Sequence, residues 1–419
     1  MTRIITFSFI LFLGSLTLSA QTIRTDVTVI GSGAAGMAAG IQAARSGVKS
    51  LILDESKTIS AVFTSGDLLS LERIRDHYIY KTEDHSSKKD SVKRPNIRQE
   101  DALQVLKSIS DTVKNLTMML NSGIREIKKE RRGWEIKLVN GRTVKTDVIV
   151  DAGNDPEISA FLNVDRQKTV IQLGSWISSP AAMPKVYRTS FGWGALHNKD
   201  KISSYLLPAA TLMPVGVENV FLIPLESKQN QPEMMVAGQA VGASAAFCAF
   251  FKTTSKNLNV RVTQGELLAF DSRLIPFSDV KFDDRHAAAF QHIGLTGILK
   301  AKTIPSGMNE EFVFDTLAPV SSEELRLPMK EYYSRSQIWF ADHKNDSLTI
   351  GDAINLLMFT ATRGEELRRE IEAGWQSSFK FSFKYDPKRI INRREFAVLT
   401  DTYLQPFNIR IDFAGNLMN

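Results

Sequence analysis

The sequence predicts an α/β protein in which a parallel sheet with covering helices is followed by a second, mainly helical domain. Three observations support this expectation. A β-branched run, 26–30, leads through a glycine cluster into an alanine-rich stretch with helical spacing. Two further short apolar runs, 49–53 and 147–150, suit buried parallel strands. Beyond residue 268 the pattern changes to helical segments that begin at Ser or Asn.

The length and the charge of the chain limit the classes of protein to which it can belong. The chain has 419 residues, of which 43% are hydrophobic, so it can bury a sizeable core and is expected to form two domains. It carries 52 Lys and Arg against 46 Asp and Glu, a formal net charge of +6, and the basic residues are scattered. The densest basic run, 125–132, also contains Glu126 and Glu130, which is typical of a solvated face. Nucleic acid is therefore not expected as a partner.

Residues 1–20 resemble a secretory signal peptide. Arg3 supplies a positive start, residues 4–18 form an apolar stretch of 15, and Ser19-Ala20 offers small residues for cleavage. The alternative, an uncleaved membrane anchor, is disfavoured because a span needs roughly 20 apolar residues. We therefore expect a periplasmic or secreted protein with no transmembrane segment after the signal is removed.

The first elements after the signal make a βαβ unit. Residues 26–30 are expected to form a buried strand, and residues 34–46 a helix that ends at Gly47. Residues 49–53 follow as a second strand.

The next elements complete the expected sheet. After a polar stretch from 76 to 95, helical spacing recurs in 103–113, and strands are expected at 116–120 and 124–127. A β-hairpin insertion is then expected over 134–145, because Asn140-Gly141 is a strong two-residue turn signal. The strand at 147–150 follows it.

A glycine motif stands between the first strand and the first helix. Gly31, Gly33 and Gly36 form the pattern G-x-G-x-x-G. The first glycine permits a tight turn, the second lets backbone approach a pyrophosphate, and the third lets the helix pack closely. Free N–H groups at the helix N-terminus would stabilise the phosphate charge. Asp54 ends the second strand, where a carboxylate can accept both ribose hydroxyls. The pattern predicts a dinucleotide site in a Rossmann-like domain; the alternative is a degenerate turn that retains only the fold.

Three later segments carry a resemblance to a known family. They are SAVFTSGDLL (60–69), DVIVDAGNDPEISAFL (147–162) and a stretch from 205 to 247 that closes with AGQAVGASAAF. In this order they resemble the FAD-dependent oxidoreductases of the two-dinucleotide-fold type, over roughly residues 25–268. The resemblance implies FAD as the cofactor. The motif and the resemblance together give these expected cofactor contacts: Gly31, Ser32, Gly33, Ala34, Ala35, Gly36, Asp54, Glu55, Ser65, Ile124, Gly153, Asp155, Gln239 and Gly242.

The last of these segments supplies a second expected helix end. Gly238 to Gly242 is expected to begin a small-residue helix that reaches Ala249. The resemblance implies that the positive end of this helix stabilises charge at the N1–C2=O edge of a reduced flavin. The alternative is that these small residues serve close helix packing.

The chain also departs from the family. Ser60-Ala61 stands in place of paired glycines, and the Cβ atoms there restrict approach of the backbone to a nucleotide. Gly153-Asn154 stands in place of Thr-Gly, and FLIPLE at 221–226 replaces a turn that contains arginine. Only residues 67–97 and 160–205 remain to build a substrate cap.

No catalytic constellation stands out, so the catalytic residues stay unknown. The six histidines show no metal spacing, and no metal ion is expected. His197 follows FGWGAL and is the best candidate acid or base, although such a histidine is more often an ordinary loop residue. Cys248 lies in an apolar helix without a CxxC partner, which is typical of a buried structural thiol. No second G-x-G-x-x-G is present to hold NAD, so electrons would pass to oxygen or another carrier.

Residues 269–419 are expected to form the mainly helical domain. Two helical starts, 319–325 and 387–396, each set a proline, then a Ser or Asn cap, then a Glu three residues after the cap. This layout resembles S-layer-homology repeats, which implies contact with envelope polysaccharide, but other helical bundles share such spacing. Five aromatic residues could contact sugar rings, although core packing is their commoner use: Trp339, Phe340, Trp375, Phe379 and Phe381.

The sequence thus predicts an exported FAD-dependent oxidoreductase that moves hydride from an unknown small-molecule or carbohydrate-related substrate. Its expected layout is a signal peptide at 1–20, an FAD-binding domain at 21–268 and a C-terminal domain at 269–419. The alternative is a degenerate flavoprotein fold that acts as a non-catalytic, envelope-binding protein.

Overall fold

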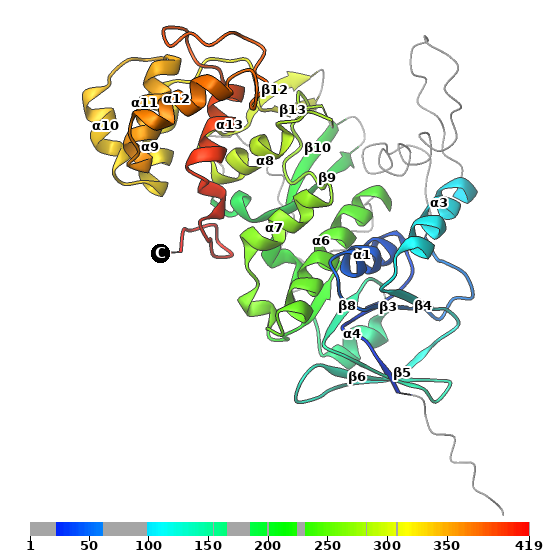
Figure 1. Ribbon diagram of the computed structural model, residues 1–419. Helices are drawn as coiled ribbons and strands as arrows, with labels where there is room; N and C mark the ends of the chain where they lie inside the picture. The colour runs from blue at the N-terminus through cyan, green and yellow to red at the C-terminus, as the bar shows by residue number, and fades with distance from the viewer. Residues whose placement is uncertain are drawn as a thin grey trace, which may run out of the picture.

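The computed structural model describes residues 22–61, 99–153, 155–165, 185–198, 201–223, 231–281, 283–306 and 309–418. The expected signal peptide, Ser65, Asn154 and the cap segment 67–97 lie outside these residues, as does much of 160–205. Figure 1 shows a part built around a sheet, connected through green helices to a group of helices from the end of the chain.

A five-stranded parallel sheet forms the centre of the first part. Its strand order is β11-β8-β2-β3-β4. The strands are β2 (Val27–Ile30), β3 (Ser50–Leu53), β4 (Leu116–Met119), β8 (Val148–Asp151) and β11 (Val220–Leu222). Every residue of β2, β3, β8 and β11 is buried, because both faces of the sheet are covered. The predicted α/β class with a parallel sheet is confirmed.

Different layers cover the two faces of this sheet. Val29 and Val150 face α1 (Ala34–Arg45) and α6 (Gln231–Phe250) in the larger hydrophobic core. Their neighbours along the strands, such as Ile30, enter a smaller core on the opposite face. That core is closed by α4 (Pro156–Leu162) and by a second sheet of β1 (Thr22–Arg24), β5 (Ile124–Lys129), β6 (Trp134–Leu138) and β7 (Thr143–Thr146).

The expected hairpin insertion is confirmed within this second sheet. Strands β6 and β7 pair antiparallel, with Trp134 opposite Thr146 and Lys137 opposite Thr143. Gly141 takes a φ of +82° in the connecting turn, a conformation that glycine adopts without strain.

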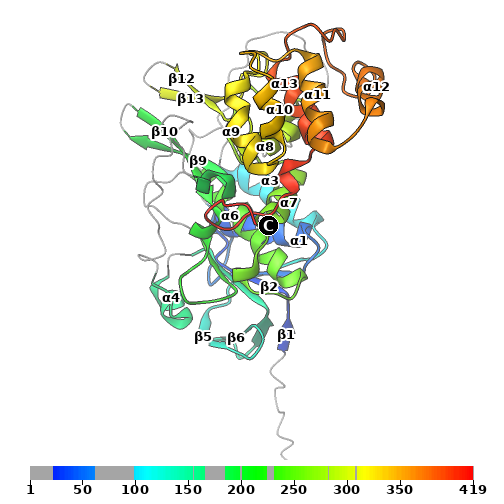
Figure 2. The same ribbon diagram turned by 90° about the vertical axis from the view of Figure 1, so that its left-hand side faces the viewer.

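Further elements lead towards the helical part. They are α3 (Gln99–Thr112), η2 (Lys185–Thr189), β9 (Ser190–Asn198), β10 (Lys201–Pro208), η3 (Ala209–Leu212), η4 (Ser255–Asn257) and α7 (Val260–Ala269). Strands β9 and β10 form an antiparallel pair that lies beside the hairpin of β12 (Lys302–Ser306) and β13 (Asn309–Val313) (Figure 2). None of the helices in the described ranges combines the length and the apolar character that a membrane span requires.

The end of the chain is mainly helical. Its elements are α8 (Ala287–Thr296), β12 (Lys302–Ser306), β13 (Asn309–Val313), α9 (Ser322–Tyr332), α10 (Ser336–Asp342), α11 (Ile350–Ala361), α12 (Glu365–Gly374), α13 (Arg393–Tyr403) and η5 (Pro406–Asn408). Trp339, Phe340, Trp375 and Phe381 are buried, so these four aromatic rings serve core packing rather than an exposed sugar-binding face.

Three chain segments close a ring of backbone hydrogen bonds among these helices. The amide of Val320 donates to the carbonyl of Ile391 (3.2 Å), that of Ile391 to Leu348 (3.0 Å), and that of Leu348 to Val320 (3.1 Å). All three side chains are fully buried. We call this arrangement the three-segment ring.

A capped helix follows each segment of the three-segment ring. Ser321 caps α9 and Asn392 caps α13, with Glu324 and Glu395 at the third helical positions, which confirms both predicted helical starts. Thr349 caps α11 through a capping box with Asp352, a third start that the sequence analysis missed.

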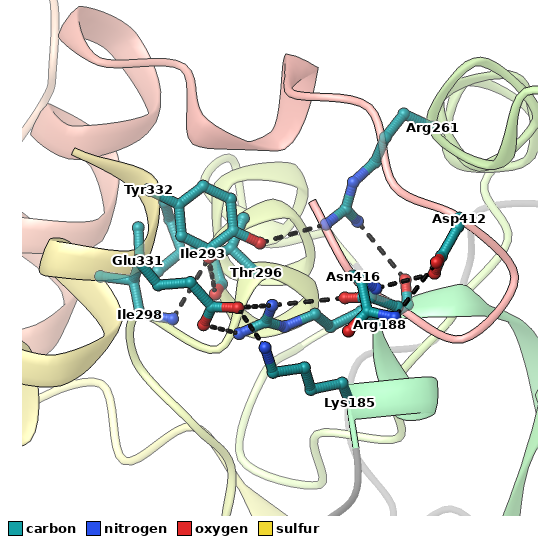
Figure 3. Close-up of polar contacts among 11 residues, drawn as sticks. Lys185, Arg188, Arg261, Ile293, Thr296, Ile298, Glu331, Tyr332, Asp412 and Asn416 are labelled. Carbon is teal, nitrogen blue, oxygen red and sulfur yellow. Dashed lines mark hydrogen bonds and ion pairs between the residues drawn. The ribbon is translucent and has the colours of Figure 1, made fainter. Parts of the chain in front are cut away.

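A buried ion pair joins the two parts of the chain (Figure 3). Arg188 of η2 is only 4% exposed and makes two hydrogen bonds of 2.9 and 2.7 Å to the carboxylate of Glu331 in α9. Lys185 also donates to Glu331 (2.7 Å) but is half exposed. Since hydrogen bonds between charged groups are strong when water is excluded, this contact holds α9 against η2.

Arg261 of α7 lies beside this ion pair. Its guanidinium donates to the side chain of Gln264 (2.9 Å) and lies over the ring of Phe407, 4.8 Å from the ring centroid. Burial lowers the pKa of Arg261. The arginine and the aromatic ring come from opposite sides of the junction, so their contact adds to the ion pair in holding the parts together.

We predict that Glu331→Gln lowers the free energy of unfolding by about 2 kcal/mol at neutral pH, the usual loss for a hydrogen bond between charged groups. The hydrogen bond from Arg188 lowers the pKa of Glu331 from 4.5 to about 2. A carboxyl with a depressed pKa stabilises the folded state above its ordinary pKa and loses this effect as the pH falls towards the folded value. The difference between wild type and variant should therefore shrink between pH 4.5 and pH 2 in urea unfolding curves.

Lys185→Gln is the matched control, because this lysine contacts the same carboxylate from the surface. It should lower the free energy of unfolding by less than about 1 kcal/mol. A constant difference between wild type and Glu331→Gln across that pH range would contradict the assignment.

Candidate functional site

The glycine motif lies where three parallel strands end. Ile30 is in register with Leu53 of β3 and with Asp151 of β8, so the carboxyl ends of β2, β3 and β8 meet at one edge of the sheet. The chain turns there at Gly31, whose φ is +102°. The amide of Gly31 donates to the carbonyl of Leu53 (2.8 Å). In an open parallel sheet this edge is the usual place for a ligand.

The three glycines have different surroundings. A Cβ on Gly36 would overlap the carbonyl oxygen of Gly31, so the helix can begin this close to the turn only with glycine there. A Cβ on Gly31 would lie 3.3 Å from the amide nitrogen of Gly153. In the part of the chain that the structure describes, no heavy atom lies within 4 Å of a Cβ placed on Gly33. Space for a ligand is therefore next to Gly33.

The start of α1 suits an anionic group. Gly33 is the N-cap residue and has no side chain to accept hydrogen bonds from the first turn of the helix, which contains no acidic residue. The amides of this turn and the helix dipole favour negative charge at such a place. Ser32, Ala34, Ala35 and Gly36 are themselves buried, so approach is from the side of Gly33. The residues present thus fit the diphosphate of a dinucleotide.

Asp54 is more enclosed than the sequence analysis expected. Its side chain is 8% exposed, and its carboxylate accepts hydrogen bonds from the amide of Ser32 (2.5 Å), the amide of Ser56 (2.7 Å) and the hydroxyl of Ser60 (3.1 Å). Burial tends to raise the pKa of Asp54, but the hydrogen bonds from Ser32 and Ser56 bring it below its ordinary value. Asp54 is therefore a carboxylate held inside the protein.

The other predicted contacts near the turn lie in different settings. Glu55 is exposed, next to Asp54. Gly153 donates its amide to Asp151 (3.2 Å), directly beside the turn. Asp155 caps α4 by accepting from the amide of Glu157 (2.8 Å). Ile124 begins β5 and packs in the smaller core, on the sheet face opposite α1.

The expected start of a helix at Gly238 is wrong. Helix α6 already begins at Gln231, so Gly238, Gln239 and Gly242 lie in its interior and offer no free amides to a flavin. A Cβ on Gly238 would overlap the carbonyl oxygen of Ala35, and a Cβ on Gly242 that of Ala39. The alternative that the sequence left open, close helix packing, is the role these glycines play.

Gln239 takes part in the same packing. Its side-chain amide donates to Gln42 of α1 (3.0 Å) and, more weakly, to the carbonyl of Phe270 at the end of α7 (3.4 Å). The side chain thus connects three helices.

Within the described residues, the remaining candidates show no second site. His197 belongs to β9, and its side chain is outside the described part of the chain. Cys248 is buried, and burial raises the pKa of its thiol to about 12, which agrees with a structural thiol. In the residues that the structure describes, no group of His, Cys, Asp and Glu is suited to hold a metal ion.

The sequence analysis missed one part of the site. Ser32 and Ser60 contact each other across the turn, with their hydroxyl oxygens 3.2 Å apart, and the amide of Ser60 donates to the hydroxyl of Ser32 (3.0 Å). The signal was available, because Ser60 is the residue that departs from the family's glycine. From the sequence alone, this serine indicates only a restriction on the approach of the backbone to a nucleotide.

Residues 26–168 match the FAD dependent oxidoreductase family. The match covers about a third of the chain and contains the glycine motif, Asp54 and β8. It confirms the resemblance found in the sequence and supports FAD as the cofactor and a general flavin oxidoreductase as the class of protein. No curated protein matches the chain.

Parts of several solved flavoproteins are similar to this chain. Bacillithiol disulfide reductase from Staphylococcus aureus is 16% identical over 32% of this chain and 39% of its own, with a TM-score of 0.24. The p-nitrophenol 4-monooxygenase from Pseudomonas putida is 13% identical over 35% of this chain and 45% of its own, with a TM-score of 0.26. The amino acid oxidase NikD is 15% identical over 34% of this chain and 54% of its own, with a TM-score of 0.25. The chain thus spans about half of these proteins' lengths or less.

We predict that Gly242→Ala lowers the free energy of unfolding by about 1–3 kcal/mol, because the added methyl group must push α6 away from the backbone of α1. Gly265→Ala in α7 is the matched control, since a Cβ there meets no heavy atom of the described residues within 4 Å. Alanine in an open helical position should stabilise the protein by up to about 1 kcal/mol. Equal effects of the two substitutions in urea titrations would contradict the packing role of Gly242.

Proposed function

Because residues 26–168 match the FAD dependent oxidoreductase family, we propose that this chain is an exported FAD-dependent oxidoreductase. The observation that carries the proposal is the open space at Gly33 beside the uncapped start of α1. That arrangement suits the diphosphate of a dinucleotide.

The residues of this chain bind and orient the cofactor in the proposed function. The first-turn amides of α1 hold the diphosphate, and Gly31 gives the turn its shape. FAD, when bound, supplies hydride transfer between a substrate and an acceptor. We propose a small-molecule or carbohydrate-related compound as the substrate and oxygen or another carrier as the acceptor, and we assign no catalytic residue.

Export is proposed from the pattern of residues 1–20, a positive start followed by an apolar stretch and small residues. The protein would then work in the periplasm or outside the cell. Its mature N-terminus should be Gln21, and N-terminal sequencing of the protein from the periplasm or the medium tests this. A chain found only in the cytoplasm with its first twenty residues intact would contradict export.

A second candidate function is envelope binding by a protein that does not use FAD. The three-segment ring favours it, because three similar helix starts agree with the resemblance to S-layer-homology repeats. In this case the partner would be an envelope polysaccharide, and the glycine turn would retain only the fold.

We predict that the purified wild-type protein absorbs at about 450 nm from bound flavin, either directly or after incubation with FAD. Gly33→Val should lower the bound flavin about tenfold or more, since the valine side chain fills the open space where the diphosphate would lie. The measurement is the ratio of visible to protein absorbance after removal of free FAD.

Gly265→Val is the matched control, because it adds the same side chain at another open glycine, in α7. It should keep the flavin content of the wild type. A colourless wild type that cannot be reconstituted would refute the oxidoreductase proposal, and sedimentation of that protein with purified cell-envelope polysaccharide would then support the second candidate.

A further inference from the structure

A closed network of hydrogen bonds ties the glycine turn to the segment after β3. One oxygen of Asp54 accepts from the amide of Ser32 (2.5 Å) and from the hydroxyl of Ser60 (3.1 Å), and the other accepts from the amide of Ser56 (2.7 Å). The hydroxyl of Ser32 in turn accepts from the amide of Ser60 (3.0 Å). We call Ser32, Asp54, Ser56 and Ser60 the serine–aspartate network.

This network leaves Asp54 little capacity for a ligand. An ionised carboxylate offers about four acceptor positions, and three of them are already used. The side chain is also almost fully enclosed. One remaining position cannot serve two ribose hydroxyls, so the usual role of an acid at the end of this strand does not fit Asp54.

The network instead acts on the turn itself. Ser32 lies between Gly31 and Gly33, so its amide bond to Asp54 and its side-chain bond to Ser60 fix the backbone on either side of the ligand space. Both bonds form within the protein, before any ligand binds. A turn ordered in this way loses less conformational entropy on binding.

We propose that Asp54 and Ser60 are positioning residues, which hold the turn in its binding form, and that Asp54 makes no contact with the ribose. The inference rests on the proposed function, because it assigns roles at the same FAD site. The inference also explains the serine at position 60, where the family has glycine. The hydroxyl of Ser60 completes the network by donating to Asp54.

The experiment compares two ligands on five proteins. The ligands are FAD and an FAD analogue whose adenosine ribose lacks both hydroxyl groups, and the proteins are wild type, Asp54→Asn, Ser60→Ala, Ser60→Thr and Glu55→Gln. Dissociation constants come from calorimetric titration of the apoprotein. Thermal unfolding of each apoprotein, followed by circular dichroism, shows that it is folded.

A positioning role affects both ligands equally. Asp54→Asn should weaken FAD and the analogue by the same factor, about tenfold, because the loss occurs in the turn and not at the ribose. Ser60→Ala removes the hydroxyl bond to Asp54 but keeps the amide bond to Ser32, so it should weaken both ligands by one common, smaller factor of about fivefold. Ser60→Thr keeps the hydroxyl and should bind both ligands within about threefold of wild type. Glu55 is itself an expected cofactor contact, so the control is read on the analogue, which lacks the ribose hydroxyls that this carboxylate would bind. Glu55→Gln removes an exposed charge without touching the network, so it should leave the analogue's affinity unchanged.

Other outcomes overturn the inference and separate it from the proposed function. If Asp54→Asn weakens FAD but not the analogue, Asp54 contacts the ribose, and the FAD site stands while the positioning role falls. If Glu55→Gln weakens the analogue as much as Asp54→Asn does, the effect is one of general charge, and the positioning role again falls. A wild-type protein that binds neither ligand overturns the proposed function itself.

Discussion

The close contact between α1 and α6 is the constraint on which the rest of the structure depends. Gly238 lies against the backbone of Ala35 and Gly242 against that of Ala39, so the two helices run in the same direction with no side chains between them at these points. Such an approach fixes the height of α1 above the sheet as well as its direction. The first turn of α1 is therefore held at the edge where β2, β3 and β8 end.

The same contact extends the order of the sheet into the helical part. Helix α6 also packs against β9 and α7, and Gln239 joins α1 to the end of α7. Two buried arginines, Arg188 of η2 and Arg261 of α7, contact α9, and Arg261 also contacts η5. A single hydrophobic core runs through all of these elements, from Val27 to Ile411. The ligand edge and the three-segment ring are thus parts of one packed body.

Local patterns in the sequence were sufficient for the elements around the sheet. The apolar runs, the glycine spacing and Asn140-Gly141 each act over a few residues, and β2, α1, β3 and the β6–β7 hairpin follow them closely. The start of α6 was misplaced because small residues suit a helix N-terminus and a helix contact equally, and only the distant partner Ala35 decides between them.

The hydrogen-bond partners inside the candidate site could not be predicted from the sequence. Asp54 was correctly placed at the end of β3, but its partners Ser32 and Ser60 are brought to it by the turn and by the chain after the strand. The start of α11 was missed for a related reason. Its cap, Thr349, lacks the preceding proline and the Glu that marked the other two starts, and Asp352 performs the same function.

The three-segment ring has a consequence for how the chain reaches its final form. Each of its hydrogen bonds joins residues far apart in sequence, and two of the three involve Ile391, close to the end of the chain. A chain that is released with its N-terminus first cannot complete the three-segment ring until nearly all of its residues are free to fold. The segments before α9 and α11 lack their partner until the segment of Ile391 is present. The helical part is therefore expected to become stable late in folding and in one step.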